Sequence, residues 1–370
     1  MLFNVSNLES EESNIGVQNV QIFFGLKDKG KSKNILFDLI FRCISWSAIE
    51  MLSLIPVLFW IGVNFAPNFI TSFLIIMVTG QLLKDMIELP RPSKKYVVKK
   101  ELSWETEPGF PSTHAMSGLL LLSMVLDAHN KGYNPSLNMY ISVSIWALLV
   151  GISRLYMGAH FVLDVIGGLS IAMIIILVLY YLNGILDKFI YESLSGGIVA
   201  IIVAIIFLMK YPQASPWTAS FGTAAIVVGT WLGVATALSF THGTSIDMIP
   251  ILRKSSQQFA QHFMITNDNI KPEVTKVILG LRVIVGLITV GGAAELCKML
   301  GTTFLSEYAR FIDLPSKIKK LGQDVDPFGK LVPIRKYYYV EVPTKLFTYT
   351  ALAWVTIVVV PNIWLAINFI

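Results

Sequence analysis

The chain has 370 residues, of which 54% are hydrophobic and only 14% are charged. Apolar runs long enough to cross a bilayer recur along it, which excludes a soluble globular domain and predicts an integral membrane protein with several spans. The formal net charge of +5 comes from basic residues scattered among loops, without an RNA or DNA motif, so nucleic acid is not an expected partner. Membrane lipids or an anionic substrate suit this charge better.

The N-terminal part, residues 1–43, is predicted to be a polar tail followed by a segment at the membrane interface. The tail mixes Ser, Asn and Glu and ends in a run of lysines, a composition typical of mobile segments. Because it has no continuous apolar core, we expect the first spanning helix to direct the chain to the membrane.

The apolar stretches predict an all-α, polytopic bundle of about nine transmembrane helices. We expect a catalytic core in residues 44–190 and further transmembrane helices and loops in residues 191–370. The expected spans lie at residues 44–64, 67–89, 112–128, 138–156, 160–182, 194–211, 222–241, 276–298 and 347–369.

A first polar motif, KDMIELPRP, ends the second expected span. Lys84 and Arg91 are seven residues apart, two helical turns, so both cations are expected on one helical face before Pro90 and Pro92 end the helix. A snorkelling lysine and an interfacial arginine would give the same pattern, so this motif alone does not indicate a site.

A second motif, GFPSTHAM, opens the third expected span. Ser112 is placed to cap this helix, and the free backbone N–H groups of a helix start, including that of Thr113, can bind phosphate oxygens. Capping does not explain His114 one step further on. That histidine is either a satisfied polar side chain or a catalytic group.

The third motif, SRLYMGAHFVLD, joins the fourth and fifth expected spans through a very short connection. Arg154 and His160 should therefore lie close together at one face of the membrane. His160 and Asp164 are four residues apart, hence on one helical face, so the carboxylate can hold one ring nitrogen while the other faces a substrate. Ionisable groups among spans are costly, which favours a functional site.

Counting the spans places all three motifs on the same side of the membrane. Together they supply three cations, hydroxyl and N–H donors and two imidazoles, which suffices for a phosphate site without a metal. A zinc site made of His114, His160 and Asp164 is the metal alternative, because these ligand types fit. The three nearby cations would oppose a bound dication, so we expect no metal.

The order K-x6-R-P, P-S-x-H and S-R-x5-H-x3-D resembles the type 2 phosphatidic acid phosphatase superfamily. Within it, the sequences PSTHAMS and SRLYMGAHFVLDVIGG, and the late EVPTKLFTYT, are similar to the sphingosine-1-phosphate phosphatase branch. The resemblance implies that His160, oriented by Asp164, attacks phosphorus to form a phosphohistidine, and that His114 protonates the leaving alkoxide. It implies no cofactor, and a phosphate held by Lys84, Arg91, Ser112, Thr113 and Arg154.

The same branch implies a sphingoid-base phosphate as the substrate and an active site facing the lumen of the endoplasmic reticulum. The loops on the side of the motifs hold most of the Lys and Arg residues, and the positive-inside rule would place that side in the cytosol instead. Three glutamates between the first two motifs either receive the ammonium of a sphingoid base or belong to a solvated loop: Glu101, Glu105 and Glu107.

Two alternatives of other classes remain open at this point. One is a broader lipid phosphate phosphatase that acts on phosphatidate or lysophosphatidate. The other is a non-enzymatic transporter or scaffold, against which the presence of both histidines argues.

Overall fold

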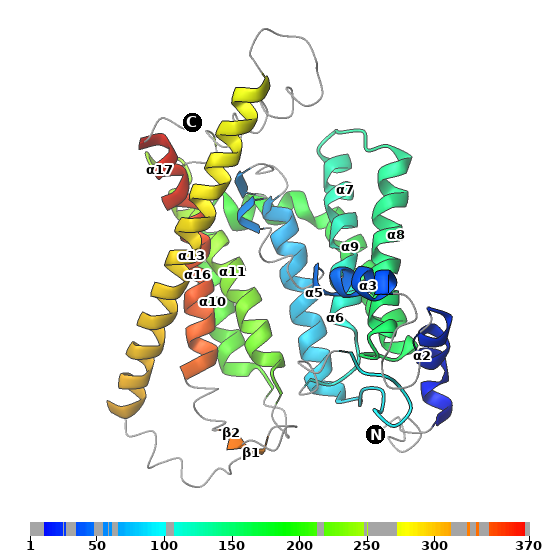
Figure 1. The fold of residues 1–370 in the computed structure, drawn as a ribbon. Coiled ribbons are helices and arrows are strands. Elements are labelled where there is room, and N and C mark those ends of the chain that lie inside the picture. Colours follow the sequence, from blue (N-terminus) through cyan, green and yellow to red (C-terminus); the bar gives the residue numbers. More distant parts are fainter. Residues whose placement is uncertain are drawn as a thin grey trace.

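A computed structural model (Figure 1) shows a bundle of helices. It describes residues 11–24, 26, 35–47, 55–57, 59–60, 66–100, 107–212, 218–247, 250, 272–311, 324–325, 331–332 and 340–366. Within these residues the strands are the short antiparallel pair β1 (Asp324–Val325) and β2 (Leu331–Val332).

Two N-terminal helices, α2 (Glu11–Phe23) and α3 (Ile35–Ser47), pack beside the core. The prediction of a mobile tail is wrong for α2, where Val17 is fully buried and the Gln21 amide donates to the carbonyl oxygens of Val98 and Tyr156, at 2.7 and 3.1 Å. These long-range contacts hold the polar helix in place. Helix α3 is amphipathic, and an ion pair joins its Asp38 to Lys100.

The core consists of α5 (Ala66–Ile87), α6 (Thr113–Gly118), α7 (Leu120–Asn130), α8 (Leu137–Tyr156) and α9 (Val162–Tyr191). Small residues let the start of α6 lie between α5 and α9. A Cβ atom at Gly80 would lie 2.7 Å from the Thr113 methyl group, and one at Gly168 would lie 2.7 Å from the Ser112 carbonyl oxygen. In a membrane, lipid chains are as apolar as the side chains, so no hydrophobic effect drives helices together, and they associate through close backbone contacts at small residues such as these.

The C-terminal half contains α10 (Leu194–Lys210), α11 (Ser220–Thr241), α13 (Pro272–Phe311), α16 (Val342–Trp354), the π-helical turn η3 (Val355–Val359) and α17 (Val360–Ala366). Helix α11 is buried over most of its length and runs parallel to α16 (Figure 1). A Cβ atom at Gly229 would lie 2.5 Å from the Leu346 carbonyl oxygen, and one at Gly233 would lie 2.3 Å from that of Thr350. Side chains larger than glycine would force the two helices apart.

Buried hydrogen bonds join this half to the core. Tyr211 and Thr218, on either side of the loop before α11, both donate to the carboxylate of Asp85 near the end of α5, at 2.9 and 2.7 Å. The end of α5 that carries the first motif is thereby fixed against α11.

Six helices of the described residues are long and apolar enough to cross a membrane, and α10 forms a further candidate with the end of α9, to which it is bent by 90°. The chain is therefore a multi-pass membrane protein. The predicted count of nine is not confirmed. The expected span 112–128 is divided into α6 and α7 at Leu119, and most of the expected span 44–64 lies outside the described residues. The six helices are Ala66–Ile87, Leu137–Tyr156, Val162–Leu182, Ser220–Thr241, Gly280–Glu307 and Val342–Ala366.

Candidate active site

The three polar motifs meet at one end of the core, where α5 and α8 end and α6 and α9 begin (Figure 1). The first motif contacts the second through Lys84, whose Nζ donates to Thr113 Oγ1 at 3.2 Å. It contacts the third through Arg91, whose Nη1 lies 3.2 Å from His160 Nε2. The predicted convergence is therefore confirmed.

Arg91 reaches the site from an extended segment and not from a helix. Helix α5 ends at Ile87, and Glu88 follows with a φ of 54°. The prediction that Lys84 and Arg91 share a helical face is wrong, because this left-handed residue turns the chain out of the helix before Pro90 is reached. The guanidinium is instead held by backbone, donating to the carbonyl oxygens of Glu107 and Ala159 at 2.7 and 2.9 Å.

Lys84 is almost completely buried and forms an ion pair with Glu107, with 2.6 Å between Nζ and Oε2. Thr223 of α11 donates to the other carboxylate oxygen, Oε1, at 3.4 Å. The prediction of a solvated loop is thus wrong for Glu107, which lies inside the site. Glu101 and Glu105, the other candidates for an ammonium contact, lie outside the described residues.

Arg154 at the end of α8 is fully buried, and its Nη1 donates to the hydroxyl of Ser45 on α3. Sequence reasoning missed Ser45. It lies in an ordinary amphipathic stretch far from the motifs, and only the packing of α3 on α8 brings it to Arg154. Helix α3 therefore supports the site.

The second motif starts α6 as predicted. Ser112 is the N-cap, and its hydroxyl accepts from the Ala115 N–H at 3.4 Å. Its own N–H donates to the Asp164 carbonyl oxygen at 3.0 Å, which ties the second motif to the third. Thr113 and His114 follow in the first turn, both buried, and the contact of Thr113 with Lys84 brings the start of α6 to this cation.

His160 is fully buried in the connection between α8 and α9. The Asp164 carboxylate lies beside it, with Oδ2 3.5 Å from Nδ1, and the same oxygen accepts from the Phe161 N–H at 2.8 Å. The carboxylate is itself confined, since a Cβ atom at Gly109 would lie 3.1 Å from Oδ2. One ring nitrogen of His160 thus faces a carboxylate and the other faces Arg91.

The surroundings keep His160 neutral. Burial lowers the pKa of its imidazole well below the usual range, and the nearby cations, together with His114, lower it further. A neutral imidazole has a lone pair available for attack, which a protonated one lacks.

The described residues contain no group of three His, Cys, Asp or Glu side chains placed to hold a metal ion. His114, His160 and Asp164 are among these residues, so they do not form the zinc site that the sequence left as an alternative.

Comparison with known proteins finds a family whose model matches the region of this site. Residues 65–186 match the model of the PAP2 superfamily, and this stretch contains every residue of the three motifs. We call this stretch, which is about a third of the chain, the PAP2 domain. It comprises α5 to α8 and all of α9 except the last five residues, while α10 to α17 lie beyond it.

The chain is 27% identical to sphingosine-1-phosphate phosphatase 1 of Rattus norvegicus over 314 residues, which cover 83% of this chain and 66% of the relative. It is 24% identical to sphingosine-1-phosphate phosphatase 2 of Mus musculus, with 86% of this chain and 84% of the relative covered. It is 23% identical to lipid phosphate phosphatase delta of Arabidopsis thaliana, with 85% and 79% covered. The chain thus spans just under two thirds of the length of the rat relative. No solved structure matches.

Proposed function

We propose that this protein is a metal-independent phosphatase that hydrolyses sphingosine 1-phosphate and related sphingoid-base phosphates through a phosphohistidine. The position of His160 Nε2 carries the proposal. This atom lies 3.2 Å from the Arg91 guanidinium, while Asp164 lies beside the opposite ring nitrogen. A nucleophilic nitrogen next to a cation that can hold phosphate oxygens is what attack on a phosphoryl group needs.

In the first step, Nε2 of neutral His160 attacks phosphorus and the bond to the lipid oxygen breaks. His114 gives its proton to the departing alkoxide. In the second step His114 takes a proton from water, which attacks the phosphohistidine and releases inorganic phosphate. Asp164 orients the imidazole and stabilises its positive charge during the first step.

The cations act on the nonbridging oxygens, where charge must be stabilised during phosphoryl transfer. The planar guanidinium groups of Arg91 and Arg154 can each bind two oxygens. Lys84 adds a point charge, and Ser112 and the start of α6, including Thr113, add donors. In this scheme the fixed cations take the role that magnesium has in other phosphoryl-transfer sites.

Recognition of the sphingoid base requires a carboxylate close to the phosphate. The ammonium of such a base is bonded to the carbon next to the one that carries the phosphate ester. We propose that the segment with Glu101, Glu105 and Glu107 receives it. The distance of 2.6 Å between the Glu107 carboxylate and Lys84 Nζ supports this proposal. If replacing all three by Gln leaves the preference for sphingosine 1-phosphate over phosphatidate unchanged, this part of the proposal is wrong.

The deciding experiment is hydrolysis of sphingosine 1-phosphate by purified protein in detergent, with EDTA present. We expect phosphate release in EDTA by the wild type and none by the His160→Ala variant. A panel with phosphatidate and lysophosphatidate separates the proposed substrate class from a broader lipid phosphate phosphatase. Equal rates on all three lipids would support the broader enzyme, and no hydrolysis of any would support a transporter or scaffold.

We further propose that the protein resides in the endoplasmic reticulum membrane with its site towards the lumen. Helix α2 supports a shared side for the N-terminus and the site, because Gln18 and Gln21 bond the backbone of Tyr96 and Val98 just after the first motif. The sequence Asn4-Val5-Ser6 is a glycosylation acceptor. A glycan on Asn4 would support the lumenal side, whereas cleavage of the N-terminal segment by protease added to intact microsomes would refute it.

A further inference from the structure

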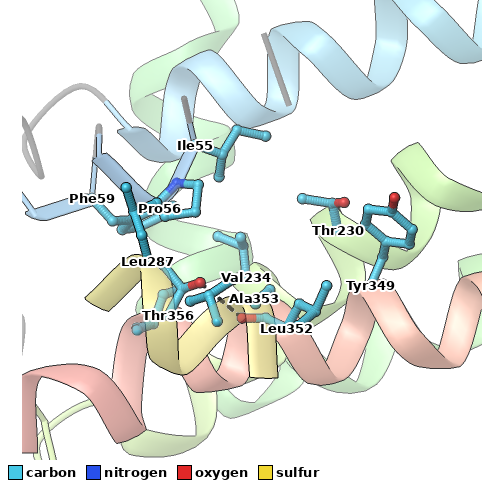
Figure 2. Close-up of a pocket in the computed structure, with 13 residues that line it drawn as sticks. Ile55, Pro56, Phe59, Thr230, Val234, Leu287, Tyr349, Leu352, Ala353 and Thr356 are labelled. Carbon is cyan, nitrogen blue, oxygen red and sulfur yellow. Dashed lines mark hydrogen bonds between the residues drawn. The ribbon is translucent and has the colours of Figure 1, made fainter. Parts of the chain in front are cut away.

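A cavity of about 350 Å³ lies between α11, α13, α16 and the segment around residue 55 (Figure 2). Every described residue that lines it lies outside the PAP2 domain. Among these described residues the walls are aliphatic and aromatic, with no charged side chain and with hydroxyl groups only from Thr230, Tyr349 and Thr356. This volume falls within the range of small-molecule sites, about 300 to 1,000 Å³, and the lining suits a hydrocarbon.

Helix α11 leads from the phosphate site to this cavity. Thr223, near its start, donates to Glu107, which is the ion-pair partner of Lys84. Thr230 and Val234, which line the cavity, follow at intervals of seven and four residues, so all three lie on one face of the helix.

Helix α16 makes the same connection. Lys345 in its first turns interacts electrostatically with Glu107. Tyr349 and Leu352 line the cavity and share a face of α16 with Lys345, at intervals of four and three residues, and Thr356 of the following turn η3 also lines the cavity. In Figure 2, Tyr349 and Thr230 lie towards one end of the cavity, and by chain order this is the end nearer the phosphate site.

The distances suit a lipid chain. At 1.5 Å per residue, Thr230 lies about 10 Å and Val234 about 16 Å along α11 from Thr223. A chain that crosses one leaflet extends over half of the hydrocarbon core, or about 15 Å. A lipid whose phosphate lies at Lys84 therefore has a chain long enough to enter the cavity.

We propose that the cavity binds the far end of the hydrocarbon chain of the substrate, and that the helices beyond the PAP2 domain thereby select chain length. This proposal rests on the proposed function, since it takes the phosphate to be held by the PAP2 domain.

The test is a Val234→Phe variant, which places a ring in the cavity, assayed on sphingoid-base 1-phosphates with chains of 18 and 8 carbons. Each buried methylene group contributes roughly fourfold to binding, so exclusion of two or more should lower kcat/KM for the long chain by about tenfold or more. The short chain does not reach Val234, which lies further along α11 than Thr230, and its kcat/KM should stay within about twofold. The matched control is Val203→Phe on α10, where the side chain is 43% exposed on the outer surface.

Leu287→Phe on α13 is the second variant, since Leu287 lines the cavity but is 45% exposed, so the added ring strains the core less. Equal losses on both chains in both variants, or no loss on either, would overturn the proposal. Thermal stabilisation of the His160→Ala protein by each lipid gives a readout without turnover. One outcome separates the two proposals. If the wild-type protein hydrolyses neither lipid, but adding Val234→Phe to the His160→Ala protein removes the extra thermal stabilisation by the long-chain lipid, the proposed function is wrong and the binding of the chain in the cavity is supported.

Discussion

The Lys84–Glu107 pair gives a sharp test of the site, because a bound phosphate dianion and the Glu107 carboxylate would compete for the ammonium group of Lys84. At the observed 2.6 Å, two unit charges attract by about 6 kcal/mol at an effective dielectric constant of 20. Removal of one partner of a buried pair costs about 3 to 5 kcal/mol, because the other charge is left uncompensated. We therefore expect Glu107→Gln to lower the free energy of unfolding by about 3 to 5 kcal/mol when no phosphate is present.

Phosphate should reverse part of the loss, since it brings a negative charge back to Lys84. Bound ligand stabilises the folded state according to its concentration relative to Kd, so tenfold tighter binding of phosphate recovers about 1.4 kcal/mol. The measurement is thermal unfolding of the detergent-solubilised protein over a series of phosphate concentrations. Inhibition of turnover by phosphate should likewise become about tenfold stronger, in line with the same change in affinity.

The matched control is Asp127→Asn. Asp127 is a buried carboxylate in an ion pair with Lys131, with 2.7 Å between Nζ and Oδ2, at the end of α7 opposite to the site. This variant should lose stability with no added response to phosphate. If phosphate stabilises wild type and Glu107→Gln equally, then Lys84 does not bind the phosphate and the reasoning is refuted.

The remaining predictions concern the histidines and the support of Arg154. His114→Ala should lower kcat by about 10² to 10⁴-fold, the usual contribution of a general acid, and full activity in this variant would contradict its role. The pKa of His160 lies well below 6.5, and only its neutral form attacks. As the pH falls from 8 to 6.5, kcat/KM should therefore not decline through protonation of His160. A decline larger than the ionisation of the substrate phosphate explains would contradict this. Ser45→Ala should lower kcat/KM about tenfold, since a hydrogen bond to a charged group contributes about 1.5 to 3 kcal/mol, and Ser45→Thr should restore it. Ser144→Ala, which removes an exposed hydroxyl from α8, is the control and should have no effect.

The local parts of the site were predictable because they depend on neighbours in the chain. A proline, a serine and a short polar run at a helix start predict the cap at Ser112, and the spacing of four predicts that Asp164 lies beside His160. Convergence of the motifs followed from counting spans. It does not depend on the total of nine, which is not confirmed, because each motif ends or begins a helix on the same side.

The predictions failed where a tertiary contact outweighed the local sequence pattern. The spacing of Lys84 and Arg91 suited a continuous helix, but Glu88 leaves the helix and Arg91 binds the backbone of Glu107 and Ala159 instead. The polarity of residues 11–23 indicated a tail, but the Gln21 amide donates to the carbonyl oxygens of Val98 and Tyr156 and so fixes the helix against the core.

By itself the sequence determined that the chain enters the membrane, which side chains carry charge there, and which helix ends present them, because hydropathy and helical period act over one or two turns. Only the tertiary structure decided that Glu107 neutralises Lys84, that Ser45 supports Arg154, and that α11 and α16 run from the site to an apolar cavity. These contacts join residues from 23 to more than 100 positions apart, and helix packing selects them through small residues and shared hydrogen bonds that leave no periodic signal in the chain.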